Sequence, residues 1–199
     1  MKPFLKSEIF AVLVIFLVLI GISTPNFVVS LRRARDQVRR NDIGSLEHAL
    51  EAYRTDFSTF PESSPDGKIV ACKAPGDKVE VDKSGRINVK LIPCEWGLDA
   101  FVDLTPGSNK VYMQKLPSDP HANSGTAYVY FSDGVRFQIL TSLEGIEEDE
   151  YNESIAARKV MCGNKICNMG KSFDCPLDKS IEEYKAYLQK LREMEDAQK

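Results

Sequence analysis

Five cysteines are the side chains of this 199-residue sequence whose spacing most directly implies chemistry. Cys72 and Cys94 flank a predicted hairpin, so a disulfide across it is sterically natural. Cys162, Cys167 and Cys175 lie within one stretch of fourteen residues that is rich in glycine and asparagine. A disulfide that closes a short loop in such a stretch stabilises the folded state by roughly 2–3 kcal/mol. One of the five must stay unpaired. The alternative, a zinc site, lacks a CxxC pair and a nearby histidine, so the cysteines favour disulfides and an oxidising compartment.

An acidic run between residues 144 and 153 is a second candidate for chemistry. Its members are Glu144, Glu147, Glu148, Asp149, Glu150 and Glu153. Hard cations such as Ca²⁺ prefer clustered oxygens, but the spacing matches no EF-hand loop. Because a run of charges is usually a solvated surface, we expect this segment to face water and hold no metal, with a calcium loop as the alternative.

No arrangement typical of an enzyme occurs along the chain. There is no GxSxG, P-loop or HExxH motif and no Ser-His-Asp arrangement. The two histidines, His48 and His121, are too few for a histidine-rich metal centre. Asp119 and His121 are close in sequence, but they fall in a proline-rich, turn-forming segment, where a loop role is expected. We therefore expect no catalytic residue, no metal and no cofactor.

The distribution of charge separates the N-terminal part from the rest of the chain. The net charge of −3 argues against a general nucleic-acid binder, which needs a strongly basic surface. Residues 1–40 carry seven Lys/Arg and two Asp/Glu, whereas the remainder carries 19 and 27. The two parts are thus expected to meet different electrostatic surroundings.

A long apolar segment lies near the N-terminus and begins the element that must position the cysteines and the acidic run. Residues 9–31 contain no charged side chain, and residues 9–22 are almost entirely aliphatic or aromatic. At about 1.5 Å per residue, some 20 such residues cross a hydrocarbon core roughly 30 Å thick. The alternative is a removed secretory signal with Lys2 and Lys6 as its basic start. We favour a membrane-inserted helix because the apolar run is long and helical patterning continues past it.

Helical periodicity continues directly from the apolar segment into a polar one. Apolar residues recur at three- and four-residue steps at Leu31, Ala34, Val38, Leu46, Ala49, Leu50 and Tyr53, interrupted by a five-residue step to Ile43. Since no strong stop precedes residues 59–61, we expect one helix of about 50 residues, roughly 75 Å long. Pro25 removes an amide donor and crowds the carbonyl of Gly21, so a kink or local melting is expected at this joint.

Glu8 lies immediately before the apolar segment. A carboxylate near hydrocarbon is costly unless it finds a partner, so an ionisable residue at this position is a functional candidate. The alternative places Glu8 at headgroup depth beside Lys6, with no function. Spacing alone does not decide between the two interpretations.

The body of the chain contains two predicted hairpins. In the first, apolar residues alternate with polar ones around a turn at residues 82–85; they are Val79, Val81, Ile87, Val89 and Leu91. In the second, residues 127–131 and 135–141 flank a favoured tight turn at 132–134, and Val135, Phe137 and Ile139 would share one face. Together the hairpins predict a small antiparallel sheet packed on the soluble half of the long helix.

A separate amphipathic helix is predicted at the C-terminus. Ser180 and Glu183 form a capping-box pattern. The apolar stripe that follows consists of Ile181, Tyr184, Tyr187, Leu188, Leu191 and Met194. We expect this stripe to pack on its own domain, with docking to a partner subunit as the alternative.

Two rules disagree about which side of the membrane holds the body. Arginines at positions 32, 33, 35, 39 and 40 outnumber Lys2 and Lys6 on the other side of the apolar segment. The positive-inside rule would keep the arginine side in the cytoplasm. The cysteines instead favour an exported body. Taken alone, the charge count is the better-tested rule and would place the body in the cytoplasm. We nevertheless expect an exported body, because of the resemblance described next.

The order of these features resembles the type IV pilin and type II secretion pseudopilin superfamily. In that family a short leader ends before a Phe, a Glu follows four residues later, and many members have a Pro seventeen residues after the Glu; Phe4, Glu8 and Pro25 have this register. Residues 50–56 and 59–61 look like the family's helix end, and 112–120 like the segment before its sheet. The hairpin at 128–144 and the cysteine-bearing tail resemble bacterial members. The resemblance covers roughly residues 4–175 and gives the C-terminal helix no counterpart.

The resemblance implies roles for the residues of this register. Members keep the body outside the cytoplasmic membrane and polymerise into a filament whose core is a bundle of the apolar helices. The Glu8 carboxylate would pair with the mature N-terminal amine of a neighbouring subunit and set axial register. Phe4 would follow the cleaved leader and carry a methylated amine. Because Pro3 stands where the leader peptidase usually needs Gly, the alternative is an uncleaved leader whose Lys2, Lys6 or first amine pairs with Glu8.

These observations predict an α+β, pilin-like fold. A long N-terminal transmembrane and amphipathic α-helix packs on a small antiparallel β-sheet, and a C-terminal helix follows. The expected parts are a leader or cytoplasmic start at 1–8, a transmembrane helix at 9–31, the soluble half of the long helix at 32–60, an extracytoplasmic β-rich head with a cysteine-bearing tail at 61–177, and an amphipathic helix at 178–199.

The predicted function is a structural subunit, not an enzyme, of a type IV pilus-like or pseudopilus filament. The subunit would sit in the cytoplasmic membrane before assembly and in a cell-surface or periplasmic filament afterwards. Expected partners are copies of itself or other pilin-like subunits, a prepilin peptidase, and an assembly ATPase with its platform. The alternative is a monomeric single-pass anchor with an extracytoplasmic binding head. The sequence does not separate secretion from adhesion, motility or DNA uptake, nor a major from a minor subunit.

Overall fold

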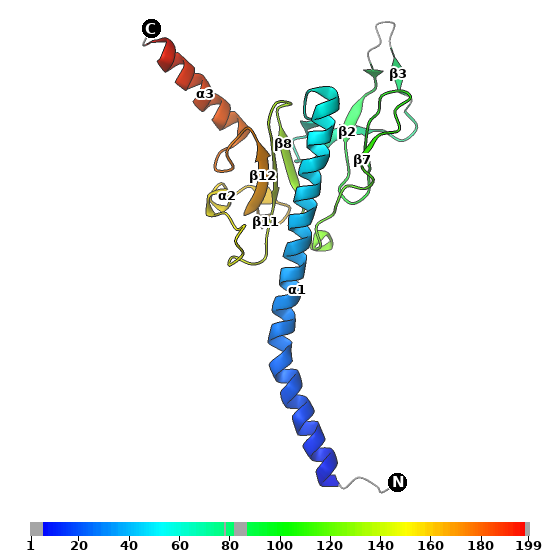
Figure 1. The fold of residues 1–199 in the computed structure, drawn as a ribbon, viewed down its shortest axis with the longest axis vertical. Helices are drawn as coiled ribbons and strands as arrows, with labels where there is room; N and C mark the ends of the chain where they lie inside the picture. Colours follow the sequence, from blue (N-terminus) through cyan, green and yellow to red (C-terminus); the bar gives the residue numbers. More distant parts are fainter. Residues whose placement is uncertain (1–5, 78, 82–86, 198–199) are drawn as a thin grey trace.

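One very long helix organises the molecule. The computed structural model describes residues 6–77, 79–81 and 87–197. Helix α1 (Lys6–Phe57) has 52 residues and is therefore roughly 78 Å long. Figure 1 shows its C-terminal half packed in the head and its N-terminal half protruding alone, with a gentle curve. The prediction of a single helix of about 50 residues is confirmed.

The helix is continuous across Gly21 and Pro25 and ends where the sequence predicts a stop. Local melting at Pro25, one of the two expected outcomes, is not found, because α1 has no break between its first and last residues. A flexible joint at Gly21 and Pro25 stays a prediction. At the far end Ser58 adopts a left-handed conformation (φ 59°) and its N–H donates to the carbonyl of Arg54 at 2.7 Å. This turn directs the chain into the head, ahead of Pro61.

The central sheet has three antiparallel strands in the order β12-β9-β8. They are β8 (Val129–Ser132), β9 (Phe137–Thr141) and β12 (Met169–Phe173). All five residues of β9 are buried, as expected for the middle strand. The second predicted hairpin is thereby confirmed, except that Val135 is 58% exposed and shares no face with Phe137 and Ile139. Val135 belongs to the turn, since its N–H and that of Arg136 donate to Asp133 Oδ1.

Short strands and turns surround this sheet. A second sheet has the order β1-β2-β5, from β1 (Glu62–Ser63), β2 (Ile69–Lys73) and β5 (Leu91–Pro93). Two-stranded pairs are β3 (Glu80–Val81) with β4 (Ile87–Asn88), β6 (Phe101–Val102) with β7 (Val111–Met113), and β10 (Met161–Cys162) with β11 (Lys165–Ile166). The remaining short elements are the 3₁₀ turn η1 (Ala122–Ser124) and helix α2 (Glu153–Ala157). The antiparallel β3–β4 pair matches the first predicted hairpin as far as Ile87, and its turn residues lie outside the described part. Leu91 instead lies in β5, which pairs with β2, and the two predicted hairpins belong to separate sheets, not to one.

The core lies between the C-terminal half of α1 and the sheets. Ile43, Leu46 and Leu50 of α1 are at most 1% exposed and pack with buried aromatic side chains such as Phe60 and Phe137. Each such side chain contributes about 1.5–3 kcal/mol by leaving water. This burial fixes the head on one end of α1 and leaves the other end free.

The C-terminal helix α3 (Ile181–Asp196) departs from the expected packing. Its capping box between Ser180 and Glu183 is present as predicted. Of the predicted apolar stripe, however, only Ile181 is buried, whereas Tyr187 and Met194 are 49% and 47% exposed. Figure 1 shows α3 projecting away from the head. The expectation that the stripe packs on its own domain is therefore wrong beyond the first turn.

Candidate functional site

The N-terminal half of α1 carries an uncovered apolar surface, which we call the bare segment (residues 9–31). Its large apolar side chains that the structure describes are between 40% exposed (Val29) and 69% exposed (Phe10). An 18-residue window of this helix has a mean hydropathy of 2.5 and none of it is buried. By length and composition α1 can cross a membrane. Apolar surface on this scale requires a cover of lipid or of other helices.

The residues predicted for processing and register lie along this end of the chain. Phe4 falls outside the described residues. Glu8 lies in the first turn of α1 with an exposed side chain, where a carboxylate complements the positive end of the helix dipole. Gly21 and Pro25 lie within the bare segment. Glu8, Gly21 and Pro25 lie in the protruding half of α1, away from the cysteines, which belong to the head.

An ion-pair collar marks the boundary between the bare segment and the packed half of α1. It joins Arg32, Arg33, Arg35, Asp36, Arg39 and Arg40 of α1 to Asp119 and to Glu144, Glu147, Glu148 and Glu150. The Arg35 guanidinium binds Glu144 through two hydrogen bonds of 2.7 and 2.6 Å. The expectation that the acidic run is solvated surface agrees with Glu147 and Glu150, whose side chains are 65% and 46% exposed. It does not describe Glu144 and Glu148, which are partly covered by their arginine partners on α1. Among the described residues no group of three metal-ligating side chains is arranged to hold a metal.

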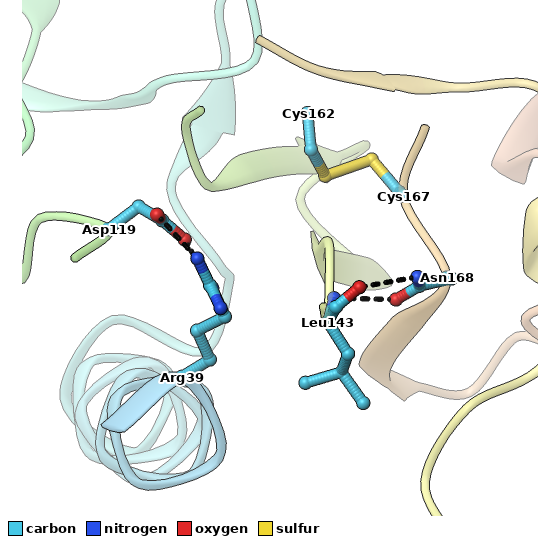
Figure 2. The surroundings of a disulfide bond; sticks show 6 residues. All are labelled: Arg39, Asp119, Leu143, Cys162, Cys167 and Asn168. Atoms are coloured by element: carbon cyan, nitrogen blue, oxygen red, sulfur yellow. Dashed lines mark hydrogen bonds and ion pairs between the residues drawn. A yellow bond between two sulfur atoms is a disulfide. The ribbon is translucent and has the colours of Figure 1, made fainter. Parts of the chain in front are cut away.

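Arg39 is the centre of the collar, and its side chain is only 1% exposed. It contacts Asp119 with two hydrogen bonds, from Nε at 2.7 Å and from Nη2 at 3.0 Å (Figure 2). Its Nη1 donates to Asp36 and to Glu144, each at 2.8 Å. A buried charge of this kind is tolerated only when its donors are satisfied by oppositely charged acceptors. Three segments far apart in sequence thus depend on one guanidinium.

The carboxylates of the collar also hold backbone. Asp36 accepts from the N–H groups of Glu144 and Gly145 at 2.9 and 3.0 Å, so α1 fixes the start of the acidic loop. Asp119 accepts from the N–H of His121 at 2.7 Å, which closes the turn leading into η1. The expected loop role of this segment is consistent with these contacts. A pocket of about 490 Å³ opens beside Arg39 and His121, but the Arg39 charge is already matched by carboxylates.

The collar shifts the titration of its most connected carboxyl. Hydrogen bonds from Arg35, and with them the charge and hydrogen bonds of Arg39, lower the pKa of Glu144 from its ordinary value of 4.5 to about 2. The charged form of Glu144 is therefore favoured by folding. The His121 ring contacts the same carboxylate, and its Nε2 is 3.3 Å from Oε1 of Glu144.

Acidification is expected to destabilise the head through Glu144. Because the folded pKa is depressed, this contribution is complete above about pH 4.5 and is lost as the pH falls toward 2. The loss should be about 2–3 kcal/mol, reduced for the 27% exposure of the side chain. Unfolding of the full chain in detergent, followed by fluorescence of Trp96 in the head, measures it. Glu144→Gln should flatten this part of the pH profile, and an unchanged profile would contradict the assignment.

The cysteines form two disulfides and leave one thiol. Cys72 pairs with Cys94 beside the first hairpin, and Cys162 pairs with Cys167 across the β10–β11 ribbon. Figure 2 shows the second disulfide near Asn168, whose amide donates to and accepts from the backbone of Leu143. Cys175 is free and buried, and burial raises its thiol pKa to about 11. The predicted pairing of Cys72 with Cys94 and the odd cysteine are both present.

Thiol counting on the isolated full chain tests this pattern. In the native state an alkylating reagent should modify no cysteine, because a buried thiol with a raised pKa reacts poorly. In denaturant without reductant it should modify one, Cys175, and after reduction all five. Three or more reactive thiols before reduction would contradict the disulfides.

Sequence reasoning missed the partners of the collar. Asp36 and Arg39 are at most 1% exposed, but the sequence analysis assigned no buried position and no partner to either. One signal was available: Asp36, Arg39, Ile43, Leu46 and Leu50 follow at three- and four-residue steps, so the two charges continue the buried stripe of α1. The sequence contains no pattern that marks Asn168, because its hydrogen bonds with Leu143 depend on where β12 pairs with β9.

Comparison with known proteins adds a relative to this geometry. No family model matches the chain, and no solved structure matches it. The type II secretion system core protein G of Escherichia coli (strain K12) is 31% identical over 128 residues. The match spans 63% of this chain and 86% of the relative.

Proposed function

Because the chain belongs to the family of type II secretion system core protein G, we propose that it is a pseudopilin, the membrane-anchored subunit of a secretion filament. As a member of this family the chain is a structural subunit and not an enzyme. The observation that carries the proposal is the bare segment of α1, an apolar surface that the molecule leaves uncovered. Two covers are available to it: lipid before assembly and other copies of α1 afterwards.

The hydrophobic effect contributes little when the bare segment moves from lipid into a bundle of helices. Lipid tails and a bundle of apolar helices have similar polarity, so moving the bare segment between them releases little hydrophobic free energy. Close packing and the pairing of a few charges must then decide when subunits assemble. Glu8 lies at the end of the bare segment and is the charge we assign to that role, with the mature N-terminal amine of a neighbour as its partner. Gly21 and Pro25 would let α1 bend while it leaves the membrane.

The head is proposed to lie outside the cytoplasmic membrane. The two disulfides support an oxidising compartment, and membership in a secretion family supports export. The arginine count of the collar points the other way under the positive-inside rule. In the folded head these arginines face the glutamates of the acidic loop, which gives them a role unrelated to topology.

Imaging of sheared material tests the proposal. Cells that express the chain with a complete secretion apparatus should yield thin filaments whose peptides include residues of the head. Mass spectrometry of the same material gives the mature N-terminus, where Phe4 as the first residue would support leader removal and an intact Met1 would exclude it. A chain found solely as a detergent-soluble monomer, with no sheared filaments, would instead support a single-pass anchor with a binding head.

A further inference from the structure

The base of α3 is fixed firmly to the head. Ile181 is 2% exposed, and Lys185 Nζ lies 3.0 Å from Asp133 Oδ2 in the β8–β9 turn. The Arg136 guanidinium lies over the Tyr184 ring at 5.7 Å. The buried Gln138 amide donates to the carbonyls of Pro176 and Lys179, which precede the helix. The direction in which α3 leaves the head is therefore set by the fold.

The remainder of α3 presents an uncovered stripe and an unusual end. Tyr187 and Met194 are about half exposed, and Leu188 and Leu191, which are half-buried, lie between them along the helix. The last turn contains acidic residues such as Glu193 and Glu195 and no basic one. Carboxylates at a helix C-terminus are repelled by the negative end of the helix dipole. A basic apolar surface against this end would relieve that repulsion.

The β10–β11 ribbon offers a surface of matching chemistry. Met161 and Ile166 are directly opposite each other in the ribbon and are 50% and 44% exposed. Residues 154–173 contain four basic side chains and no acidic one. Two of them, Lys159 and Lys165, are exposed and form no ion pair within the described part of the chain. The disulfide between Cys162 and Cys167 holds the ribbon rigid.

The exposed stripe of α3 and the β10–β11 ribbon lie apart within one molecule, since α3 projects away from the head. In Figure 1, α3 and the ribbon lie on the same side of α1, and the ribbon is nearer to the N-terminus of α1. Copies with parallel α1 helices that are displaced along the helix axis bring the ribbon of one toward α3 of another. Such a head-to-tail contact leaves both surfaces free at the ends and propagates without closing.

We propose that α3 of one copy docks on the β10–β11 ribbon of the next copy along the filament. The apolar stripe around Tyr187 covers Met161 and Ile166, and the acidic end of α3 meets Lys159 and Lys165. This inference rests on the proposed function, since it requires parallel stacked copies. A membrane surface is a poorer occupant, because α3 projects from the end of the molecule opposite the bare segment and its last turn would be repelled by anionic lipid.

Disulfide trapping in assembled filaments tests the contact. Full-length Tyr187→Cys and Ile166→Cys variants are expressed together with the secretion apparatus, and sheared filaments are imaged and then analysed without reductant. The expected result is a cross-linked dimer in the mixture, a ladder when one chain carries both substitutions, and neither product from a single variant. A dimer from Tyr187→Cys alone would show α3 pairing with α3 and overturn the proposal, as would its cross-linking to a different protein.

The outcomes separate this inference from the proposed function. Filaments without a cross-link overturn the α3 contact and leave the filament role intact. The absence of both filaments and cross-links overturns the filament role and this inference with it.

Charge reversal tests the assigned face of the ribbon. Lys165→Glu should weaken the ladder, and adding Glu193→Lys to the same chain should restore it. Lys115→Glu, which lies outside the ribbon, should have no effect. A ladder unchanged by Lys165→Glu would overturn the assigned face.

Discussion

Replacing Arg39 with Met is expected to lower the free energy of unfolding of the head by about 3–5 kcal/mol. The substitution keeps an unbranched side chain in the core but leaves Asp36 and Asp119, both buried, without their shared counter-charge. Removing one partner of a buried pair is far more destabilising than its net contribution suggests, because the remaining charge stays desolvated. The loop that begins at Glu144 would also lose one of its contacts with α1, the hydrogen bond that Arg39 donates to Glu144.

Fluorescence of Trp96 reports this loss selectively. Trp96 is the single tryptophan of the chain and packs edge-on against Tyr128 at 6.0 Å, so its signal follows the head and not the bare segment. Arg33→Met is the matched control, because Arg33 is 68% exposed and lies 3.8 Å from Glu148. That change should stay within about 0.5 kcal/mol. Equal unfolding midpoints in urea for the two variants would contradict the central role of Arg39.

Glu8→Gln is expected to leave the protein in the membrane and to reduce the yield of sheared filaments at least about tenfold. The amide keeps the shape of the side chain but removes the charge that would pair with a neighbour's terminal amine. Opposite charges within a lipid-free helix bundle attract much more strongly than in water, and the amine would be left unpaired. A difference of about 1.4 kcal/mol per subunit is already a factor of ten.

Two controls separate register from folding and insertion. Glu62→Gln, an exposed glutamate of the head, should leave the yield unchanged. Glu8→Asp keeps the charge on a shorter side chain and should assemble better than Glu8→Gln. Membrane fractionation and Trp96 fluorescence should be the same for all variants. A normal filament yield from Glu8→Gln would rule out the charge pair as the source of register.

Local patterns predicted the elements that position the site. The length of α1, its end before residues 59–61, the second hairpin and the capping box of α3 all depend on residues a few positions apart. The same patterns gave the antiparallel order around the turn at 132–134, although Val135 belongs to the turn. Family membership confirms the structural, non-enzymatic role that the motifs indicated.

The collar and the course of α3 depend on contacts that no local pattern contains. Arg39 and Glu144 are separated by 105 residues and Arg35 and Glu144 by 109, so their pairing follows from the packing of the whole head. The five-residue step from Val38 to Ile43 interrupts the apolar periodicity of α1. The structure explains this step: Val38 is 43% exposed and lies on another face of the helix, and Arg39 occupies the buried position four residues before Ile43. The apolar stripe of α3 was visible in the sequence, but amphipathicity does not say whether the surface that covers such a stripe belongs to the same chain.

Disulfide trapping along the bare segment tests whether copies of α1 cover one another in the filament. Pairs of cysteines placed in the segment, for example Phe10→Cys with Leu17→Cys, are expressed in separate copies and oxidised within sheared filaments. We expect cross-linked products for some offsets and not for others, because parallel α1 helices would pack at one fixed axial register. Sheared filaments that contain the head but give no cross-link at any offset would contradict this packing, since the bare segment would then be covered by something other than its own copies.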